Sequence, residues 1–350
     1  MAGKITFIMG RLSAKSVGAG LLEHLDALAA KLHERAPAAL EVFDPDDVHA
    51  ARVATRRLSA ALDLTSPVVG KRHRKPLAAG LKKLRRRLGP LRDADVMVAL
   101  LDALAKDARH AAAAGWLRDR VAANRESRQA KARNKSAAGA LRSVDAWSAV
   151  RDEVAQAHDA VDCLLAESLH RQVDAFAERA DRLAAGVRGA DGGGASMAGG
   201  AVLGVAVGRQ DPHALRVAGK ALRYTLEMAA AAGRSPGAGL LRRFKRMQDL
   251  LGDWHDLVVL ADRALREVVA AELTLHDAAG SERVLELARV VVRRSARELE
   301  AFAKLWTRAG DATTATLRSA FPLTRDVSDV AVEEVERAAE PDGPEADPEQ

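Results

Sequence analysis

Two short segments of this sequence place cationic side chains at helical spacing. In HAARVATRRL (49–58) these side chains are His49, Arg52 and Arg56, and in HALRVAGKAL (213–222) they are His213, Arg216 and Lys220. Residues three or four positions apart share one face of a helix, where like charges repel by a few tenths of a kcal/mol per pair. Arginine grips an anionic oxygen pair with two parallel hydrogen bonds, and lysine supplies a point charge. Each stripe is therefore either a solvated surface or a holder for an anion.

A second pair of segments repeats at almost the same interval. LKKLRRRLGPLRDADVMVAL (81–100) aligns with FKRMQDLLGDWHDLVVLADR (244–263) at a shift of 163 residues, and the first pair aligns at 164. The distance from histidine to glycine is 40 residues from His49 to Gly89 and 39 residues from His213 to Gly252. Two blocks in the same order predict a tandem duplication. A solvated face would have to arise twice in the same pattern, which favours an anion ligand.

Helical geometry defines the faces that these segments present. At 100° per residue, the cations of each first block fall within about 80° of arc. We expect the opposite side to pack into a core, through Val53, Ala54 and Leu58 in the first copy and Val217, Ala218 and Leu222 in the second.

The composition favours helices throughout. Hydrophobic residues make up 48% of the 350 residues, with alanine and leucine prominent, and aromatics make up only 3%. Alanine, leucine, arginine and glutamate are good helix formers, so we predict an all-α protein. The duplication predicts two tandem helical bundles of similar plan, related by a pseudo-twofold. Helices are expected over 19–36, 46–64 and 72–88, the last ended by Gly89-Pro90, and longer helical runs over 93–135, 141–185, 256–278 and 281–308. Asp93 and Asp256 are then expected as caps or first-turn acids.

The domain organisation follows from these patterns. A glycine-rich stretch over 186–208 has little helix potential and separates the two copies. It holds no Gly-Lys-Ser/Thr step of a phosphate-binding loop. We expect an N-terminal segment over 1–15, a first helical-bundle half over 16–185, the linker over 186–208, a second half over 209–310 and an extended acidic, disordered tail over 311–350.

The charge is divided unevenly along the chain. The net charge is +6, yet the residues from Asp326 onward carry ten acids and one arginine, which leaves about +15 on residues 1–325. A strongly basic body favours a polyanionic partner. One cysteine, Cys163, excludes an intrachain disulfide, and neither a signal peptide nor an apolar membrane span is evident, so we expect a cytoplasmic protein.

The paired blocks resemble a known family. The first copy reads His-x-x-Arg-x-x-x-Arg-Arg-Leu followed by Leu-Gly-x-x-Arg-Asp. The second reads His-x-x-Arg-x-x-x-Lys-x-Leu-Arg-Tyr followed by Gln-Asp-x-Leu-Gly-x-x-His-Asp. Together they are similar to the CHAD domain, the conserved-histidine α-helical domain, over about residues 16–308. The resemblance implies two four-helix bundles with a basic central channel that binds inorganic polyphosphate, and an association with polyphosphate granules. Carried over residue by residue, the implied contacts are His49, Arg52, Arg56, Arg57, Lys82, Arg86, His213, Arg216, Lys220, Arg223 and Lys245. Ser59 departs from the pattern, because the family usually has an arginine there, as Arg223 is in the second copy.

Other functions remain open at this point. The nearest sequence to the Glu-x-Glu-x-Lys strand of a fused triphosphatase is EVER (334–337), which lacks the lysine, and the His-Asp pairs have no further ligands at metal spacing. We therefore expect no enzyme activity, no cofactor and no metal. The alternatives are a basic helical protein that binds nucleic acid weakly, or a helical adaptor that accompanies polyphosphate-metabolising enzymes. No membrane partner is expected, and the oligomeric state is left open.

Overall fold

The computed structural model describes residues 14–133, 142, 144–191 and 211–323, and this part of the chain contains helices and connecting turns without a β-strand. The predicted all-α class is therefore confirmed. The helices are α1 (Ala14–Glu41), α2 (Pro45–Leu64), α3 (Lys71–Leu104), α4 (Ala111–Arg133), α6 (Trp147–Gln156), α7 (His158–Asp191), α8 (Pro212–Ala231), α9 (Ala238–Ala270), α10 (Leu273–His276) and α11 (Ala278–Ala320).

The two helices that carry the cationic stripes begin in the same way. The Asp44 carboxylate accepts hydrogen bonds from the backbone N–H groups of Asp46 and Asp47 at the start of α2, and Asp211 accepts one from Ala214 at the start of α8. A proline follows each aspartate, and its fixed φ suits the first helical turn. Each stripe therefore lies at a defined distance from a capped helix end.

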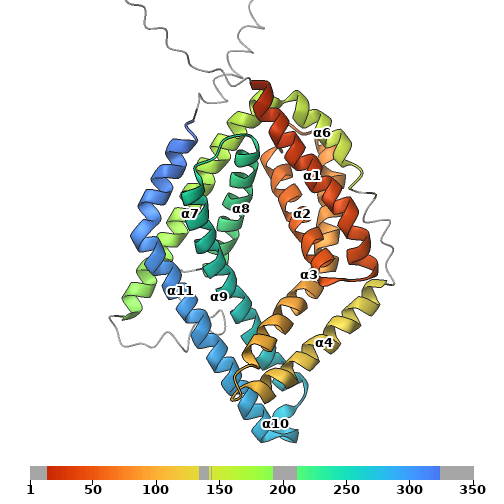
Figure 1. The fold of residues 1–350 in the computed structure, drawn as a ribbon, viewed down its shortest axis with the longest axis vertical. Coiled ribbons are helices and arrows are strands. Elements are labelled where there is room, and N and C mark those ends of the chain that lie inside the picture. Colours follow the sequence, from red (N-terminus) through yellow and green to blue (C-terminus); the bar gives the residue numbers. More distant parts are fainter. Residues whose placement is uncertain (1–13, 134–141, 143, 192–210, 324–350) are drawn as a thin grey trace, which may run out of the picture.

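The helices form two groups, each closed by a cycle of contacts. In the first group α1 contacts α2, α2 contacts α3, and α6 contacts both α1 and α3. In the second group α7 contacts α8, α8 contacts α9, and α11 contacts both α7 and α9. Figure 1 shows the two groups on opposite sides of the molecule, which we call the first and second halves. Helix α4 packs mainly on α3 and is counted with the first half. Helix α7 packs with the second half, whereas the sequence placed residues up to 185 in the first.

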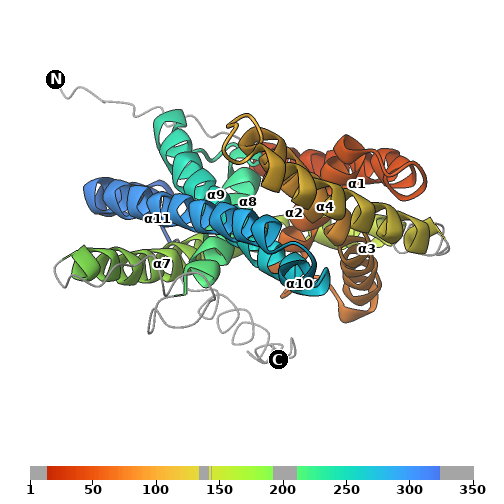
Figure 2. The same ribbon diagram turned by 90° about the horizontal axis from the view of Figure 1, so that it is seen from below.

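The halves meet at two junctions. At one end α1 and α2 contact α8, and at the other end α4 contacts α9 and α11. Between these junctions α2 and α3 diverge from α8 and α9 (Figure 1). The view from below places α4, α10 and α11 in front of the remaining helices (Figure 2).

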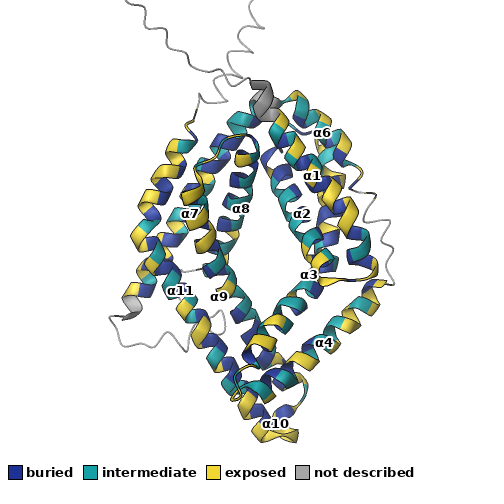
Figure 3. Cartoon of the chain, viewed as in Figure 1, coloured by how far each residue is buried: buried dark blue, intermediate teal, exposed yellow. Residues whose placement is uncertain are grey.

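Apolar side chains are buried in two separate clusters. The larger cluster fills both halves and includes Leu58 of α2 and Leu222 of α8. The smaller cluster lies at the second junction, where the ends of α3 and α9 pack with α4, α10 and α11. Buried positions run along the inner sides of the helices in each half (Figure 3). Both cation-bearing helices are thus anchored by apolar packing on the side away from their cations.

Helix α3 corrects the expectation that Gly89-Pro90 ends a helix. It continues through both residues to Leu104. A proline inside a helix removes one hydrogen bond and costs about 3 kcal/mol, but Leu84, Leu88 and Leu91 are completely buried around it. Burial of these leucines offsets the loss. As a further correction, Asp93 of α3 and Asp256 of α9 lie inside long helices and cap neither one.

The predicted core face of the second stripe also needs correction. Ala54, Leu58 and Leu222 are buried, but Val217 is 51% exposed. At 100° per residue, Val217 stands only about 40° from His213, so it belongs to the cationic side of the helix. Helix α7 extends to Asp191 and α11 to Ala320, beyond the boundaries expected at 185 and 310. The remainder of the expected linker and the segment 324–350 of the acidic tail lie outside the described residues.

Candidate anion-binding site between the two halves

Arg52 is held across the surface of α3. One guanidinium nitrogen, Nη1, donates a hydrogen bond to the carbonyl oxygen of Arg85 at 3.2 Å, and Nη2 lies 3.8 Å from the carboxylate of Asp93. A Cβ atom at Gly89 would come within 2.9 Å of Nη1, so the absence of a side chain there makes room for the guanidinium. Only 13% of the Arg52 side chain is exposed. The glycine that the duplicated blocks share therefore positions a cation in the first half.

Arg216 and Lys220 form the matching stripe on α8. Both are half-buried, and burial lowers the pKa of each. The pKa of Lys220 falls to about 7, first because of burial and then because the Arg216 and Arg56 guanidinium groups repel its charge. The Arg216 Nε is buried and has no hydrogen-bond partner in the part of the chain that the structure describes. These cations are thus incompletely satisfied by the protein itself.

The cations of the two stripes lie close to one another across the two halves. Arg56 of α2 lowers the pKa of both Arg216 and Lys220 of α8, and Asp93 of α3 acts in the opposite direction on Arg216. Such charge effects require short separations, because solvent and salt screen distant pairs. The structure therefore brings together Arg52, Arg56, Arg216 and Lys220, which were predicted from separate copies of the repeat.

Positive charge outweighs negative charge in this cluster. Its carboxylates are Asp93 and Asp256, and Asp63 acts on Arg85 and Asp253 on Asp256 from its edge. The pKa of Asp256 is raised because burial outweighs the nearby Arg216 and Lys220. Its cations also include Arg85 and Arg92, which the sequence analysis missed and whose charges act on Arg52. We call the set Arg52, Arg56, Arg85, Arg92, Arg216, Lys220, Asp93 and Asp256 the central cluster. An uneven balance at half-buried positions suits a bound anion.

The histidines lie at the edge of the central cluster. His49 and His213 are exposed, and the His213 ring lies 5.3 Å from the ring of His255. Although the residue as a whole is exposed, partial desolvation of the His49 ring, with Arg92 second, lowers its pKa. Burial, with Arg216 second, lowers the pKa of His255 to about 4. His255 is therefore neutral near pH 7 and acts there as a hydrogen-bonding group.

The other predicted contacts lie elsewhere. Arg57 and Arg223 both bind the carboxylate of Glu227. Lys245 donates to Asp249 on its own helix at 2.7 Å and is exposed. Lys82 and Arg86 are exposed on α3, one turn apart. Their roles as polymer contacts stay predictions.

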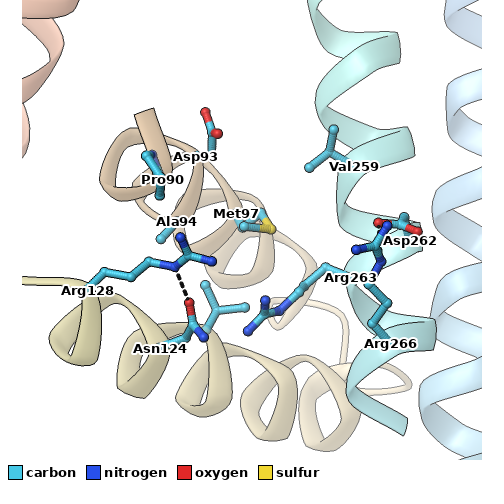
Figure 4. Close-up of a pocket in the computed structure, with 11 residues that line it drawn as sticks. Pro90, Asp93, Ala94, Met97, Asn124, Arg128, Val259, Asp262, Arg263 and Arg266 are labelled. Carbon is cyan, nitrogen blue, oxygen red and sulfur yellow. Dashed lines mark hydrogen bonds and ion pairs between the residues drawn. The ribbon is translucent and has the colours of Figure 1, made fainter. Parts of the chain in front are cut away.

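A pocket of about 320 Å³ opens beside the central cluster at the second junction. Asp93 and Pro90 of α3 form one wall, Asn124 and Arg128 of α4 a second, and α9 a third (Figure 4). Arg128 donates to the Asn124 side chain at 2.7 Å. Since Asp93 belongs to both features, the pocket continues the central cluster towards α4.

The described residues contain no group of three or more histidine, cysteine or acidic side chains placed to hold a metal ion. Within the same residues, every helix is too short or too polar to cross a membrane. What the site offers chemically is a set of fixed positive charges and hydrogen-bond donors.

The chain is similar to known proteins in sequence and in fold. The model of the CHAD domain family matches residues 23–265. The crystal structure of the CHAD domain from the plant Ricinus communis is similar with a TM-score of 0.52 and 20% identity, over 88% of this chain and 92% of that one. PptA from Streptomyces chartreusis matches with a TM-score of 0.49 and 17% identity, over 84% of this chain and 99% of that one. No curated protein matches the chain. Because the family model covers well over half of its length, this chain belongs to the CHAD domain family.

Proposed function

We propose that this protein binds inorganic polyphosphate in the central cluster and catalyses no reaction. The observation that carries the proposal is the meeting of half-buried cations from α2 and α8, where Arg56 of α2 lowers the pKa of Arg216 and Lys220 across the two halves. Burying a charge without a partner is costly, so these side chains favour a ligand that supplies negative charge. The family resemblance implies the same ligand.

A phosphate polymer suits the arrangement better than a single anion does. Arg52 and Arg56 stand one turn apart on α2, and Arg216 and Lys220 stand one turn apart on α8. One exposed ion pair contributes only about 0.2 to 1 kcal/mol, so several must act on one molecule to give micromolar affinity. A chain of phosphates presents such repeated charges, and arginine binds each in a bidentate manner.

The proposal includes the finer points of the architecture. The two contact cycles of helices are two four-helix bundles related by a pseudo-twofold, so that α2 and α8 line one channel from opposite sides. Polymer held there would place the protein on polyphosphate granules in the cytoplasm. Lys82, Arg86 and Lys245 are exposed and would contact the polymer outside the channel.

The test is a competition titration at about 150 mM salt, where exposed charges are largely screened. Labelled long-chain polyphosphate is bound to the protein and displaced by unlabelled polyphosphate, DNA or RNA. We expect polyphosphate to compete at least about tenfold better than nucleic acid, a difference of about 1.4 kcal/mol. A variant with Arg52, Arg56, Arg216 and Lys220 changed to alanine should lose the binding.

A matched control removes the same charge elsewhere. Arg171, Arg294, Lys304 and Arg308 are exposed on α7 and α11, and no ion pair within the described residues includes them. Their joint change to alanine should leave polyphosphate affinity within about twofold, because distant charges are screened. Equal competition by nucleic acid would favour the nucleic-acid alternative. Equal losses in the two variants would show that only net charge matters, and the proposal would fail.

A further inference from the structure

Glu227 of α8 lies between two arginines at the first junction. The Arg57 guanidinium of α2 binds it through two bonds, Nε to Oε2 at 2.7 Å and Nη2 to Oε1 at 3.0 Å. Arg223, one turn before Glu227 on α8, donates from Nε to Oε1 at 3.1 Å. All three side chains are partly buried. The carboxylate thus joins the first half to the second.

Glu267 of α9 has the same environment at the second junction. Arg120 of α4 donates from Nε to its Oε2 at 2.5 Å, and Arg263, one turn before it on α9, pairs with its Oε1 at 2.5 Å. Only 10% of the Glu267 side chain is exposed. This carboxylate also joins the first half to the second.

The two sites share one plan. In each, a glutamate of the second half pairs with an arginine four residues earlier on its own helix and with an arginine of the first half. We call them the Glu227 clamp (Arg57, Arg223 and Glu227) and the Glu267 clamp (Arg120, Arg263 and Glu267). They lie at opposite ends of the space between the halves, because α2 contacts α8 at one junction and α4 contacts α9 at the other.

Repulsion between cations of the central cluster acts against the two clamps. Arg56 of α2 repels Arg216 and Lys220 of α8, while Asp93 of α3 attracts Arg216. Because the cations are in excess, the net force between the junctions pushes the halves apart. Charge-assisted hydrogen bonds to a partly buried carboxylate are strong and directional, and losing one partner leaves the other charge unpaired. Two such clamps hold the cationic stripes at a fixed separation in the absence of polymer.

We infer that Glu227 and Glu267 are positioning residues that set the separation of the two cationic stripes and so prepare the site for polymer. The inference rests on the proposed function for its consequence in binding, though not for its consequence in structure. It also assigns Arg57 and Arg223 to holding the halves together, in place of the polymer contacts that the family resemblance implies. In the alignment of the two copies, Ser59 of the first half corresponds to Arg223 of the second. The first half therefore has no copy of the Glu227 clamp.

The test uses the full chain with Glu227→Gln and Glu267→Gln, singly and together. Two exposed alanines, Ala79 of α3 and Ala315 of α11, are changed to cysteine in a Cys163→Ala background and spin-labelled. In the double variant we expect retained helical circular dichroism, a broader distribution of label distances, and polyphosphate affinity reduced by about threefold or more because the site is no longer pre-organised.

The direction of the affinity change is the decisive feature. The double variant gains two units of positive charge, so charge alone predicts tighter binding of a polyanion. The matched control is Glu23→Gln with Glu282→Gln, two exposed glutamates that form no ion pair within the described helices. We expect this control to keep the parent distances and to bind equally well or slightly more tightly.

The possible failures are distinguishable. An unchanged distance distribution in the double variant, with affinity equal to or above that of the control, overturns the clamps. Tighter binding with Glu227→Gln alone would mean that the glutamate withholds Arg57 and Arg223 from the polymer. If the parent protein binds no polyphosphate, the proposed function fails, and the label distances still decide whether the clamps hold the halves.

Discussion

At the scale of single residues, Lys220 links stability to pH. Its folded-state pKa of about 7 lies well below the value of about 10.4 of a free lysine, because the fold buries it beside Arg216 and Arg56. Between pH 7 and pH 10 the unfolded chain therefore binds more protons than the folded chain at this site. The free energy of unfolding should rise with pH over that window, by up to about 1.4 kcal/mol per pH unit. Urea titrations at pH 7, 8 and 9 measure this rise.

Lys220→Met is the control for this prediction, because methionine has a similar length and no charge. The variant should show a smaller rise in stability between pH 7 and 9 than the parent protein. Bound polyphosphate should also flatten the rise in the parent protein, because a neighbouring anion restores the pKa of the lysine. Parallel pH profiles for parent and variant would contradict the assignment.

Substitution of Gly89 should affect thermal stability and polyphosphate affinity in different directions. Gly89→Ala places a Cβ atom about 2.9 Å from Arg52 Nη1, so the guanidinium must move. Alanine is also the better helix former, by about 1 kcal/mol inside a helix. We expect the variant to melt at the same or a higher temperature and to bind polyphosphate several-fold more weakly. The two effects are measured by thermal unfolding and by the competition titration.

Gly252, the equivalent position of the second half, is the internal control for Gly89. It lies inside α9, and a Cβ atom there would meet nothing within 4 Å. Gly252→Ala should therefore raise stability and displace no cation. If both variants weaken binding to the same extent, displacement of Arg52 is not the cause.

At the scale of elements, Pro90 interrupts the hydrogen bonding of α3 without ending the helix. Its ring leaves the carbonyl oxygen four residues earlier, that of Arg86, without the usual N–H partner. Pro90→Ala restores that hydrogen bond, so we expect the free energy of unfolding to rise by about 1 to 3 kcal/mol. Chemical denaturation of Pro90→Ala beside the parent protein measures the effect. A loss of stability would mean that the packing of α3 depends on the proline.

Several elements were predictable because local patterns specify them. The helical class followed from composition, and the helix expected over 46–64 matches α2, which begins at Pro45. The end expected at Gly89-Pro90 was wrong because burial of Leu88 and Leu91 outweighs the local preference of glycine and proline. Tertiary packing of this kind is absent from any local window of sequence.

The candidate site, like the fold, was predictable from the sequence only in part. Arg52, Arg56, Arg216 and Lys220 were found because the duplication repeats them at one helical spacing. The clamps were missed because Arg57 and Glu227 are 170 residues apart, and Arg120 and Glu267 are 147 residues apart. The spacing of Arg223 with Glu227, and of Arg263 with Glu267, was a visible signal, since both are four residues apart on a helix. Their partners in the first half depend on how the halves meet.

At the scale of the whole molecule, position matters more than net charge. Residues 1–325 carry about +15, yet most of those cations are exposed and spread over both halves. At physiological ionic strength, charges separated by more than about 8 Å are largely screened from each other. The central cluster differs because its cations are half-buried and close together. The two junctions between the halves are what make that closeness possible.

The dependence of affinity on salt tests this distinction. For a flexible polyanion, each phosphate that a protein neutralises steepens the plot of log affinity against log salt by about 0.7. Changing Arg52, Arg56, Arg216 and Lys220 to alanine should therefore make the slope shallower by about 3 units, whereas changing Arg171, Arg294, Lys304 and Arg308 should leave it nearly unchanged. Titrations between about 50 and 300 mM salt measure both slopes. Equal slopes for the two variants would show that polyphosphate samples the whole basic surface instead of the central cluster.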